Sequence, residues 1–454
     1  MQHSLVDNRT LNDCKKTSTY RSVPERLSET CLYADVKNLR INPTLTKFTP
    51  NYQLWSDGSN KHRWVYLPES KVIDTSGPDR WVFPVGTQFF KEFRQYDKTT
   101  GKEIKVETRH LQKITPGNGI DSWLISTYAW NKGQTDAMLS PGEQNVLNTD
   151  HDIPTEQDCV DCHKGNIDII LGFEAIQLSD EQGKLQFGHG PKRGNNEWTL
   201  SLLHARQKLS VPIAMPTLPG TKLEQKALGY LHANCGNCHN PLGHAADQDA
   251  EHLKLRHKLA FDTIEKTNVY RTAVNQETKN FTAVPYIALG AKADEMALYQ
   301  SAVFLRMNST DENYRMPPIA REKTDYQGLK MIHSWLGTLA TPDDVVFIKD
   351  HRKQASDIYS NEVFPDRSGD LSGPGLQIEV QFYQNKFVPP VMAVYWPEDN
   401  SLASTPIMDH KDGYFTEKLI VGSKGSKMSL RNSDDVGHTI YVKDEKQKVK
   451  WQLN

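Results

Sequence analysis

The feature that most constrains this chain is a five-residue pattern, C-x-x-C-H, which occurs twice. The first pentad runs from Cys159 to His163, and the second runs from Cys235 to His239. Two thiols at this spacing can add to the two vinyl groups at one edge of a porphyrin, and the adjacent histidine is then held below the ring. The pattern predicts two covalently bound haem c groups. The expected thioether anchors are Cys159, Cys162, Cys235 and Cys238, and the expected proximal iron ligands are His163 and His239.

Zinc is the alternative, because two C-x-x-C pairs can supply the four thiolates of one zinc site. Here the whole stretch 163–234 separates the pairs, which is far more than the spacing in a zinc ribbon. A shared zinc ion would also leave the histidine after each pair without a role. We therefore prefer haem attachment.

Composition indicates a globular chain of several domains. Its 454 residues are too many for one ordinary hydrophobic core. A formal net charge of −2 gives no reason to expect a nucleic-acid partner. No apolar run approaches the roughly 18 residues that span a bilayer, so we expect no transmembrane segment.

The cysteines outside the pentads, Cys14 and Cys31, enclose a short loop. Covalent haem c is completed outside the bacterial cytoplasm, so we expect a periplasmic or extracellular protein whose signal peptide is absent from this sequence. Unpaired thiols are uncommon in such an oxidising compartment. A Cys14–Cys31 disulfide that fixes the N-terminal arm is therefore expected, and two free thiols are the alternative.

The chain divides into six expected segments. Short runs rich in aromatic and β-branched residues, such as Thr87–Phe93 and Trp123–Trp130, predict an antiparallel β-sandwich early in the chain. Glycine and proline are frequent around the first pentad, where a haem could replace the missing apolar core. The segments are an N-terminal arm (1–34), a β-sandwich (35–150), a first haem segment (151–220), a second haem domain (221–342), a linker (343–375) and a C-terminal β domain (376–454).

The second haem domain resembles a class I cytochrome c. Apolar residues recur at helical spacing before the second pentad and again near residue 335, on either side of a Met316-Pro317 loop. The resemblance implies that Met316 is the distal iron ligand, and such His/Met ligation raises the redox potential relative to His/His. A loop methionine that fills a gap is the alternative. The stretch from His239 to Met316 is long for that class, which predicts an insertion around 250–290.

The distal ligand of the first haem stays open at this stage. Met215-Pro216 repeats the local Met-Pro pattern, and His189 lies between two glycines on an expected turn. A single histidine is more often a surface residue than a ligand. The candidates are Met215, His189, His204 and His151, and an open iron is the alternative.

The C-terminal segment alternates apolar and polar residues and resembles a cupredoxin strand-turn-strand. No cysteine follows Cys238, so a type 1 copper site, which needs a thiolate, is not expected. His410 and His438 with a methionine are a lesser alternative for another copper. The expected fold is therefore a multidomain α+β chain, with an N-terminal β-sandwich, a mostly α-helical di-haem cytochrome c region and a C-terminal cupredoxin-like β-sandwich.

Several motifs together resemble a family of bacterial exported di-haem c-type proteins. Besides the two pentads they are Leu54-Trp55-Ser56-Asp57-Gly58 and Phe83-Pro84-Val85-Gly86-Thr87, and the resemblance covers roughly residues 20–340. It implies export, haem and electron transfer to redox partner proteins, and it implies no substrate. Cys31 stands where the family has glycine, which fits a disulfide specific to this chain.

Three functions remain open on these grounds. The first is an electron carrier with both irons closed, acting alone or as a link in a homo-oligomer or filament. The second is a peroxidase-like haem oxidoreductase, in which the first haem is open and the second haem supplies electrons. The third is a structural β protein stabilised by haem. Attachment motifs establish a cofactor and not a reaction, so the carrier is preferred without excluding the others.

Overall fold

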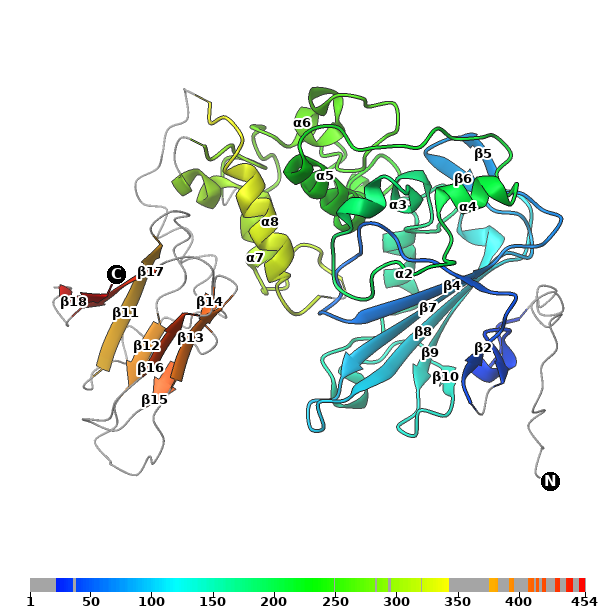
Figure 1. Cartoon of the computed structure of the whole chain (residues 1–454), viewed down its shortest axis with the longest axis horizontal. Helices are drawn as coiled ribbons and strands as arrows, with labels where there is room; N and C mark the ends of the chain where they lie inside the picture. The colour runs from blue at the N-terminus through cyan, green and yellow to red at the C-terminus, as the bar shows by residue number, and fades with distance from the viewer. Residues whose placement is uncertain are drawn as a thin grey trace.

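The N-terminal part is built on one twisted antiparallel sheet of six strands, in the order β10-β9-β8-β7-β4-β3 (Figure 1). The computed structural model describes residues 22–35, 38–248, 250–281, 284–292, 295–319 and 321–342, with the backbone of the strands between 375 and 453. The sheet comprises β3 (Thr46–Lys47), β4 (Asn60–Tyr66), β7 (Gln88–Tyr96), β8 (Glu103–Lys113), β9 (Trp123–Trp130) and β10 (Ala137–Leu139). Two small hairpins accompany it, β1 (Tyr33–Asp35) with β2 (Arg40–Ile41) and β5 (Asp74–Gly77) with β6 (Arg80–Val82).

The expected N-terminal β-sandwich is wrong, because no second sheet covers the six-stranded sheet in the described residues. On one face of the sheet, apolar side chains pack against loops and short helices from 169–213. This core joins Phe89 and Trp123 of the strands to Ile169, Phe173 and Leu203. Alternating side chains reveal strands, but they do not reveal whether a sheet or a set of loops covers them.

The opposite face of the sheet is covered by the described end of the N-terminal arm. Leu27, Cys31 and Leu32 are fully buried there against strand residues that include Phe90 and Tyr128. Cys14 lies outside the described residues, so the Cys14–Cys31 disulfide stays a prediction.

The expectation of a mostly α-helical region over 151–342 is also wrong. Most of it is loop, and only α5 and α8 exceed eight residues among the described helices. The α-helices are α2 (Glu156–His163), α3 (Ala175–Leu178), α4 (Leu200–Ala205), α5 (Lys222–Asn234), α6 (Asn268–Thr272), α7 (Ala302–Asn308) and α8 (Tyr326–Leu336). The short 3-10 turns are η1 (Leu27–Glu29), η2 (Ile120–Ser122), η3 (Val146–Asn148), η4 (Gln182–Leu185), η5 (His244–Gln248), η6 (Ile264–Lys266) and η7 (Glu295–Gln300). In the described part, no helix has the length and apolar character needed to cross a membrane.

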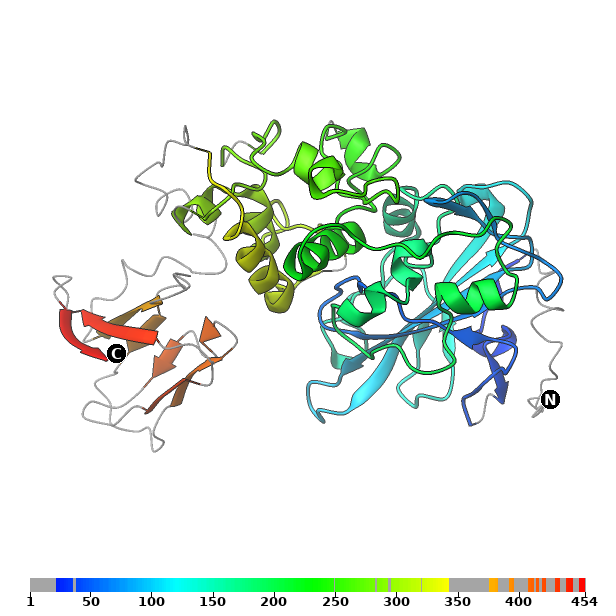
Figure 2. The ribbon, with the colours of Figure 1, turned by 45° about the horizontal axis from the view of Figure 1, so that its top comes forward.

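The two helices predicted from apolar spacing are present and pack on each other (Figure 2). Thr221 caps α5 in a capping box with Glu224, and the buried face of α5 meets α8 in one core. A Cβ added at Gly328 of α8 would lie 2.6 Å from the Tyr230 ring, so only glycine permits this close approach. Because α5 ends at Asn234, this helix pair fixes the position of Cys235 at the start of the second pentad.

The C-terminal strands form two sheets, of which the structure describes only the backbone. A five-stranded sheet has the order β15-β12-β11-β17-β18, and a three-stranded sheet has the order β14-β13-β16. The strands are β11 (Gly375–Phe382), β12 (Met392–Tyr395), β13 (Ile407–Lys411), β14 (Tyr414–Phe415), β15 (Leu419–Val421), β16 (Ser429–Asn432), β17 (His438–Lys443) and β18 (Val449–Leu453). The side chains of His410 and His438 lie outside the described residues, so a copper site there stays untested.

Candidate haem-binding sites

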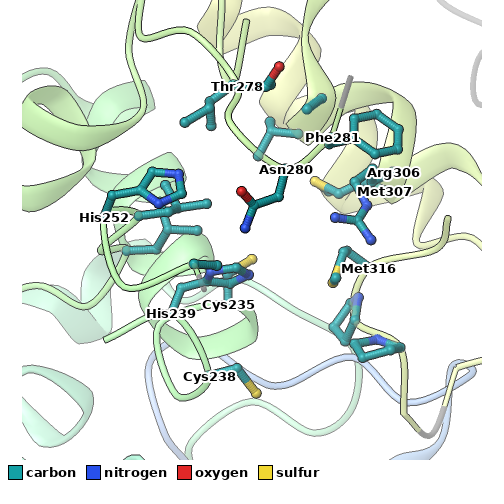
Figure 3. Close-up of a pocket in the computed structure, with 18 of the residues that line it drawn as sticks. Cys235, Cys238, His239, His252, Thr278, Asn280, Phe281, Arg306, Met307 and Met316 are labelled. Atoms are coloured by element: carbon teal, nitrogen blue, oxygen red, sulfur yellow. The ribbon is translucent and has the colours of Figure 1, made fainter. Parts of the chain in front are cut away.

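A cavity lined by residues between 234 and 318 lies beside the second pentad. Figure 3 shows His239 and Met316 on opposite sides of it, with Asn280 pointing into the space between them. The structure therefore brings together residues that are far apart in the sequence. Other lining residues include Cys235, Cys238, Leu253, Phe281, Val303, Arg306, Met307 and Pro317.

The residues around this cavity fit a haem. Two thiols, an imidazole and a thioether line one mostly apolar space, which is the donor set that a covalent His/Met haem needs. Burial lowers the pKa of His239 to about 4, so its imidazole is neutral and able to bind a metal. Its Nδ1 is buried with no hydrogen-bond partner among the described residues. Met307 also lines the cavity, and sequence reasoning missed this second sulfur.

The first pentad forms α2 and ends it at His163. The Nδ1–H of His163 donates to the carbonyl of Ile169 at 2.6 Å, which leaves Nε2 as the nitrogen with a free lone pair. Metal-binding histidines usually make this kind of second contact, which fixes the tautomer and ring orientation. Ile169 has φ +54°, a left-handed conformation that is uncommon for a β-branched residue. Burial lowers the pKa of His163 to about 4, so this imidazole is also neutral.

A buried carboxylate fixes the turn that presents the Ile169 carbonyl. Asp168 is 1% exposed and accepts hydrogen bonds from the Phe83 backbone N–H at 2.7 Å and from Trp123 Nε1 at 2.8 Å. It also forms an ion pair with Lys113, which is fully buried. The sheet therefore holds the orientation of His163 through Asp168, a residue that sequence reasoning did not single out.

The two pentads lie against each other. The thiols of Cys162 and Cys238 interact directly, which raises the pKa of Cys162 well above its ordinary value and lowers the pKa of Cys238. A Cβ added at Gly165 would lie 1.7 Å from the Asn237 carbonyl oxygen, so the chain just after the first pentad touches the second. At the same junction, His244 Nδ1 lies 3.3 Å from an Asp161 oxygen, and Lys164 forms an ion pair with Asp247. The two pentads are therefore adjacent in the fold.

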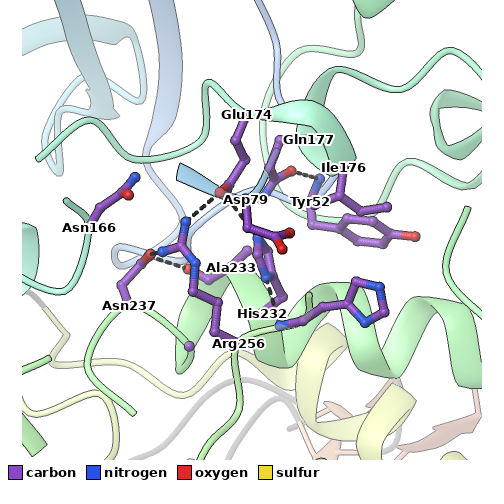
Figure 4. A network of polar contacts seen from close by, with 12 residues as sticks. Tyr52, Asp79, Asn166, Glu174, Ile176, Gln177, His232, Ala233, Asn237 and Arg256 are labelled. Atoms are coloured by element: carbon purple, nitrogen blue, oxygen red, sulfur yellow. Dashed lines mark hydrogen bonds and ion pairs between the residues drawn. The ribbon is translucent and has the colours of Figure 1, made fainter. Parts of the chain in front are cut away.

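A polar network anchors the second pentad to the rest of the chain (Figure 4). Glu174 accepts from His232 Nε2 at 2.8 Å and pairs with Arg256, whose Nη1 donates to Asn237 Oδ1 at 3.3 Å. The His257 backbone N–H donates to His232 Nδ1 at 3.1 Å, which fixes the tautomer of His232. Burial opposes ionisation of Glu174, but Arg256 and His232 outweigh it and lower its pKa to about 2.

This network predicts a loss of stability in acid. Glu174 has a depressed pKa in the folded state, so its contribution is complete above the ordinary value of 4.5 and is lost as the pH falls towards about 2. The shift corresponds to about 3 kcal/mol. Glu174→Gln should therefore lower the unfolding free energy near neutral pH. It should also flatten the acid limb, the fall of the unfolding free energy with decreasing pH, as measured by denaturant titrations between pH 7 and about 3.

Glu181→Gln is the control, because Glu181 is exposed and, among the described residues, forms an ion pair only with Lys184, three positions along the chain. It should leave the acid limb unchanged. An acid limb in Glu174→Gln as steep as that of the parent protein would contradict the assignment.

Two of the four candidates for the first distal ligand are engaged elsewhere. The Met215 sulfur accepts hydrogen bonds from Ser179 Oγ at 3.4 Å and from the Asp180 N–H at 3.3 Å. His204 Nε2 accepts from the Ile213 N–H at 3.3 Å. Among the described residues, neither side chain forms a hydrogen bond with His163.

The other two candidates are paired with carboxylates. His189 Nε2 lies 3.0 Å from an oxygen of Asp325. His151 Nε2 lies 2.7 Å from an oxygen of Glu107, which also pairs with Arg109. The charge of Arg109 acts on both thiols of the first pentad. His151 is therefore the candidate that the structure connects to that pentad.

The zinc alternative finds no ready-made ligand set. Within the described residues, no three or more His, Cys, Asp or Glu side chains converge as a group that could hold a metal ion. The thiols of the two pentads are adjacent through Cys162 and Cys238 without forming a cluster of four.

Comparison with known proteins adds no relative. No protein-family model matches the chain, and no curated protein or solved structure matches it.

Proposed function

We propose that this chain is a di-haem c-type cytochrome that carries electrons between redox partner proteins in the periplasm or outside the cell. The observation that supports this most directly is the contact between the two pentads at Cys162 and Cys238. Thioether bonds to these sulfurs would fix two haems at adjacent pentads. Haem supplies one-electron chemistry when bound, and adjacent attachment suits electron exchange between two such centres.

The side chains around the second site favour a closed iron. His239 and Met316 face each other across the cavity, and its lining is mostly apolar. Such a lining excludes water, and a sulfur ligand raises the potential relative to a second histidine. These residues bind and orient the group and keep the site dry, which is what a carrier requires.

The alternative is a haem oxidoreductase with an open first iron. It is favoured by one observation, that Met215 and His204 are engaged with other groups while Arg109, Glu107 and His151 lie together near the first pentad. A paired histidine and arginine beside an open iron could handle protons and charge on a small oxidant.

The experiment that separates the two is an optical spectrum of the oxidised and reduced protein, with and without carbon monoxide, combined with the intact mass. The carrier predicts two haem additions, low-spin bands and no response to carbon monoxide. Carbon monoxide binding to half of the haem would favour the oxidoreductase. Zero haem additions would overturn both functions.

Replacing Met316 tests the distal ligand of the second haem. Met316→Leu should remove the weak sulfur-to-iron band of the oxidised spectrum and lower the potential of one haem, because thioether ligation raises that potential. Met307→Leu is the matched control, since Met307 lines the same cavity. It should keep the band. Loss of the band in Met307→Leu alone would assign the ligand to Met307 instead.

A further inference from the structure

One face of the sheet carries three basic side chains in direct register beside the first pentad. Arg63 of β4 pairs with Lys91 of β7, and Lys91 pairs with Arg109 of β8. We call Arg63, Lys91 and Arg109 the cation row. Like charges directly opposite each other destabilise a sheet, and these are partly or fully buried. An arrangement of this kind requires compensation.

The next row of side chains on the same face contains a fourth cation and an aromatic ring. Lys61 is opposite Phe93, and Phe93 is opposite Glu107. The Lys91 ammonium lies 4.7 Å from the centre of the Phe93 ring, and the Arg109 guanidinium lies 4.5 Å from it. Lys61 is 5.8 Å away. Cation–π contacts of this kind offset part of the cost, but one ring cannot neutralise three cations.

Several carboxylates act on these cations from nearby: Asp57 and Asp325 on Lys61, Glu197 on Arg63, and Glu107 on Lys91. Glu107 pairs with Arg109 and with His151. Within the described part of the chain, no carboxylate forms an ion pair with Lys61, Arg63 or Lys91. Lys61 is 0% exposed and its ammonium donates to the Ser59 carbonyl at 2.9 Å, so Lys61 is closed to a ligand. Arg63 is 5% exposed.

The charged forms of Lys61, Arg63 and Lys91 are disfavoured in the folded protein. Burial, reinforced by the neighbouring Arg63, lowers the pKa values of Lys61 and Lys91 well below the ordinary range. Burial also lowers the pKa of Arg63 to about 10. A bound anion would reverse these shifts by favouring the charged forms.

The cation row faces the first pentad. Lys91 and Arg109 both act electrostatically on Cys162 and on His163. A group attached at this pentad would therefore lie within reach of the row.

We propose that the cation row of Arg63, Lys91 and Arg109 forms an anion site that binds the two propionate carboxylates of the haem attached at Cys159 and Cys162. The inference rests on the proposed function. Carboxylates match the guanidinium and ammonium donors in charge and hydrogen bonding. Covalent attachment holds them close to the site at a high effective concentration, which a free anion lacks. A carboxylate or oxyanion from solution has the same chemistry, and the test below separates the two sources.

The test measures the midpoint potential of each haem against pH, from about 5 to 8, in Lys91→Gln and Arg63→Gln. The cations keep the propionates ionised in the parent protein, so the potential of the first haem should be nearly flat over this range. Removing one cation should raise a propionate pKa into the range, and the potential should then change with pH. Arg63→Lys keeps the charge and should retain the flat profile. Lys91→Gln keeps the test available if Arg63→Gln folds poorly.

Lys105→Gln is the matched control, because Lys105 lies on the same strand as Arg109 but stacks on Trp130 at 4.8 Å in the core of the opposite face. It should leave both profiles unchanged. If Lys91→Gln and Arg63→Gln behave like this control, the anion site is wrong.

Added acetate and sulfate distinguish the two sources of anion. With the propionates in place, neither salt should shift the potential of the parent protein beyond the effect of chloride at the same ionic strength. A saturable shift that is lost in Lys91→Gln would overturn the propionate assignment in favour of an anion from solution. The intact mass tests separately whether haem is attached, since a protein with no haem refutes the proposed function itself.

Discussion

Alanine at both Cys235 and Cys238 is expected to remove one haem from the protein and to leave the other in place. The intact mass should fall by one haem, and the reduced spectrum should lose the bands of the His/Met centre. The reason is that both thiols line the cavity opposite Met316, while the other two thiols belong to α2. The reciprocal change, alanine at Cys159 and Cys162, should remove only the other haem.

The same variant should be strongly destabilised around the cavity, between the end of α5 and α7. The cavity is lined by apolar side chains, and a haem would bury their surface and its own. At about 25 cal/mol per Å², a few hundred Å² of apolar surface corresponds to roughly 5–10 kcal/mol. The free energy of unfolding of a native protein is only about 5–15 kcal/mol. We therefore expect the region around this cavity, which includes α7, to unfold in far less denaturant than in the parent protein.

The pair of variants also tests zinc directly. If four thiolates shared one zinc ion, either double substitution would release the same metal, and neither would change a haem count. Equal metal loss from both variants, with no porphyrin in the parent protein, would contradict the haem sites. The matched pair is informative because the cysteines of the two pentads are adjacent in the fold, through Cys162 and Cys238.

Local sequence signals predicted the local structure well. Trp123–Trp130 is a strand over its whole predicted length, and the apolar spacing around Leu228 and Ile332 located α5 and α8. These features depend on a residue's immediate neighbours, through side-chain alternation or helical periodicity. The C-x-x-C-H pentads are equally local, although their haem groups stay a prediction.

The arrangement of these elements was not predictable in the same way. Both the β-sandwich and the mostly helical region were wrong, because the sequence does not show that loops near Phe173 cover the sheet. Around the first pentad, frequent glycine and proline predicted a segment that lacks an apolar core, but Ile169, Phe173 and Leu203 form one with the sheet. The expectation of a mostly α-helical di-haem region overestimated the helices, since only α5 and α8 exceed eight residues among those described.

The supporting residues were missed because their partners are distant in the chain. Asp168 acts through Phe83 and Trp123, and nothing near it in the sequence marks it. A signal did exist for the cation row. Side chains alternate between the two faces of a strand, so Lys61 and Arg63 lie on the same face of β4 as the apolar Val65. This placed two charges on a face that the sheet was expected to bury. Buried charge in a strand indicates a binding site or a paired network.

Arg321 is the residue for which we expect the largest effect outside the pentads. It is 3% exposed and donates to the carbonyls of Met316 at 2.6 Å and Ser309 at 2.7 Å. It also bonds the carbonyls of Met307 and Arg306 at the end of α7. Arg321→Met should leave these buried acceptors unpaired and lower the unfolding free energy by about 3–5 kcal/mol, measured by denaturant titration.

Arg321→Met should also weaken the sulfur-to-iron band, because Arg321 binds the Met316 carbonyl and so fixes the backbone that carries the sulfur. This distinguishes it from Met316→Leu, which should lose the band with little loss of stability. Lys323→Met is the control from the same segment, since Lys323 is half exposed and pairs with Asp150 at the surface. An unchanged band in a destabilised Arg321→Met would limit Arg321 to a structural role. A weakened band would show that the clamp on the Met316 carbonyl positions the sulfur, so that ligand placement and local stability depend on one guanidinium group.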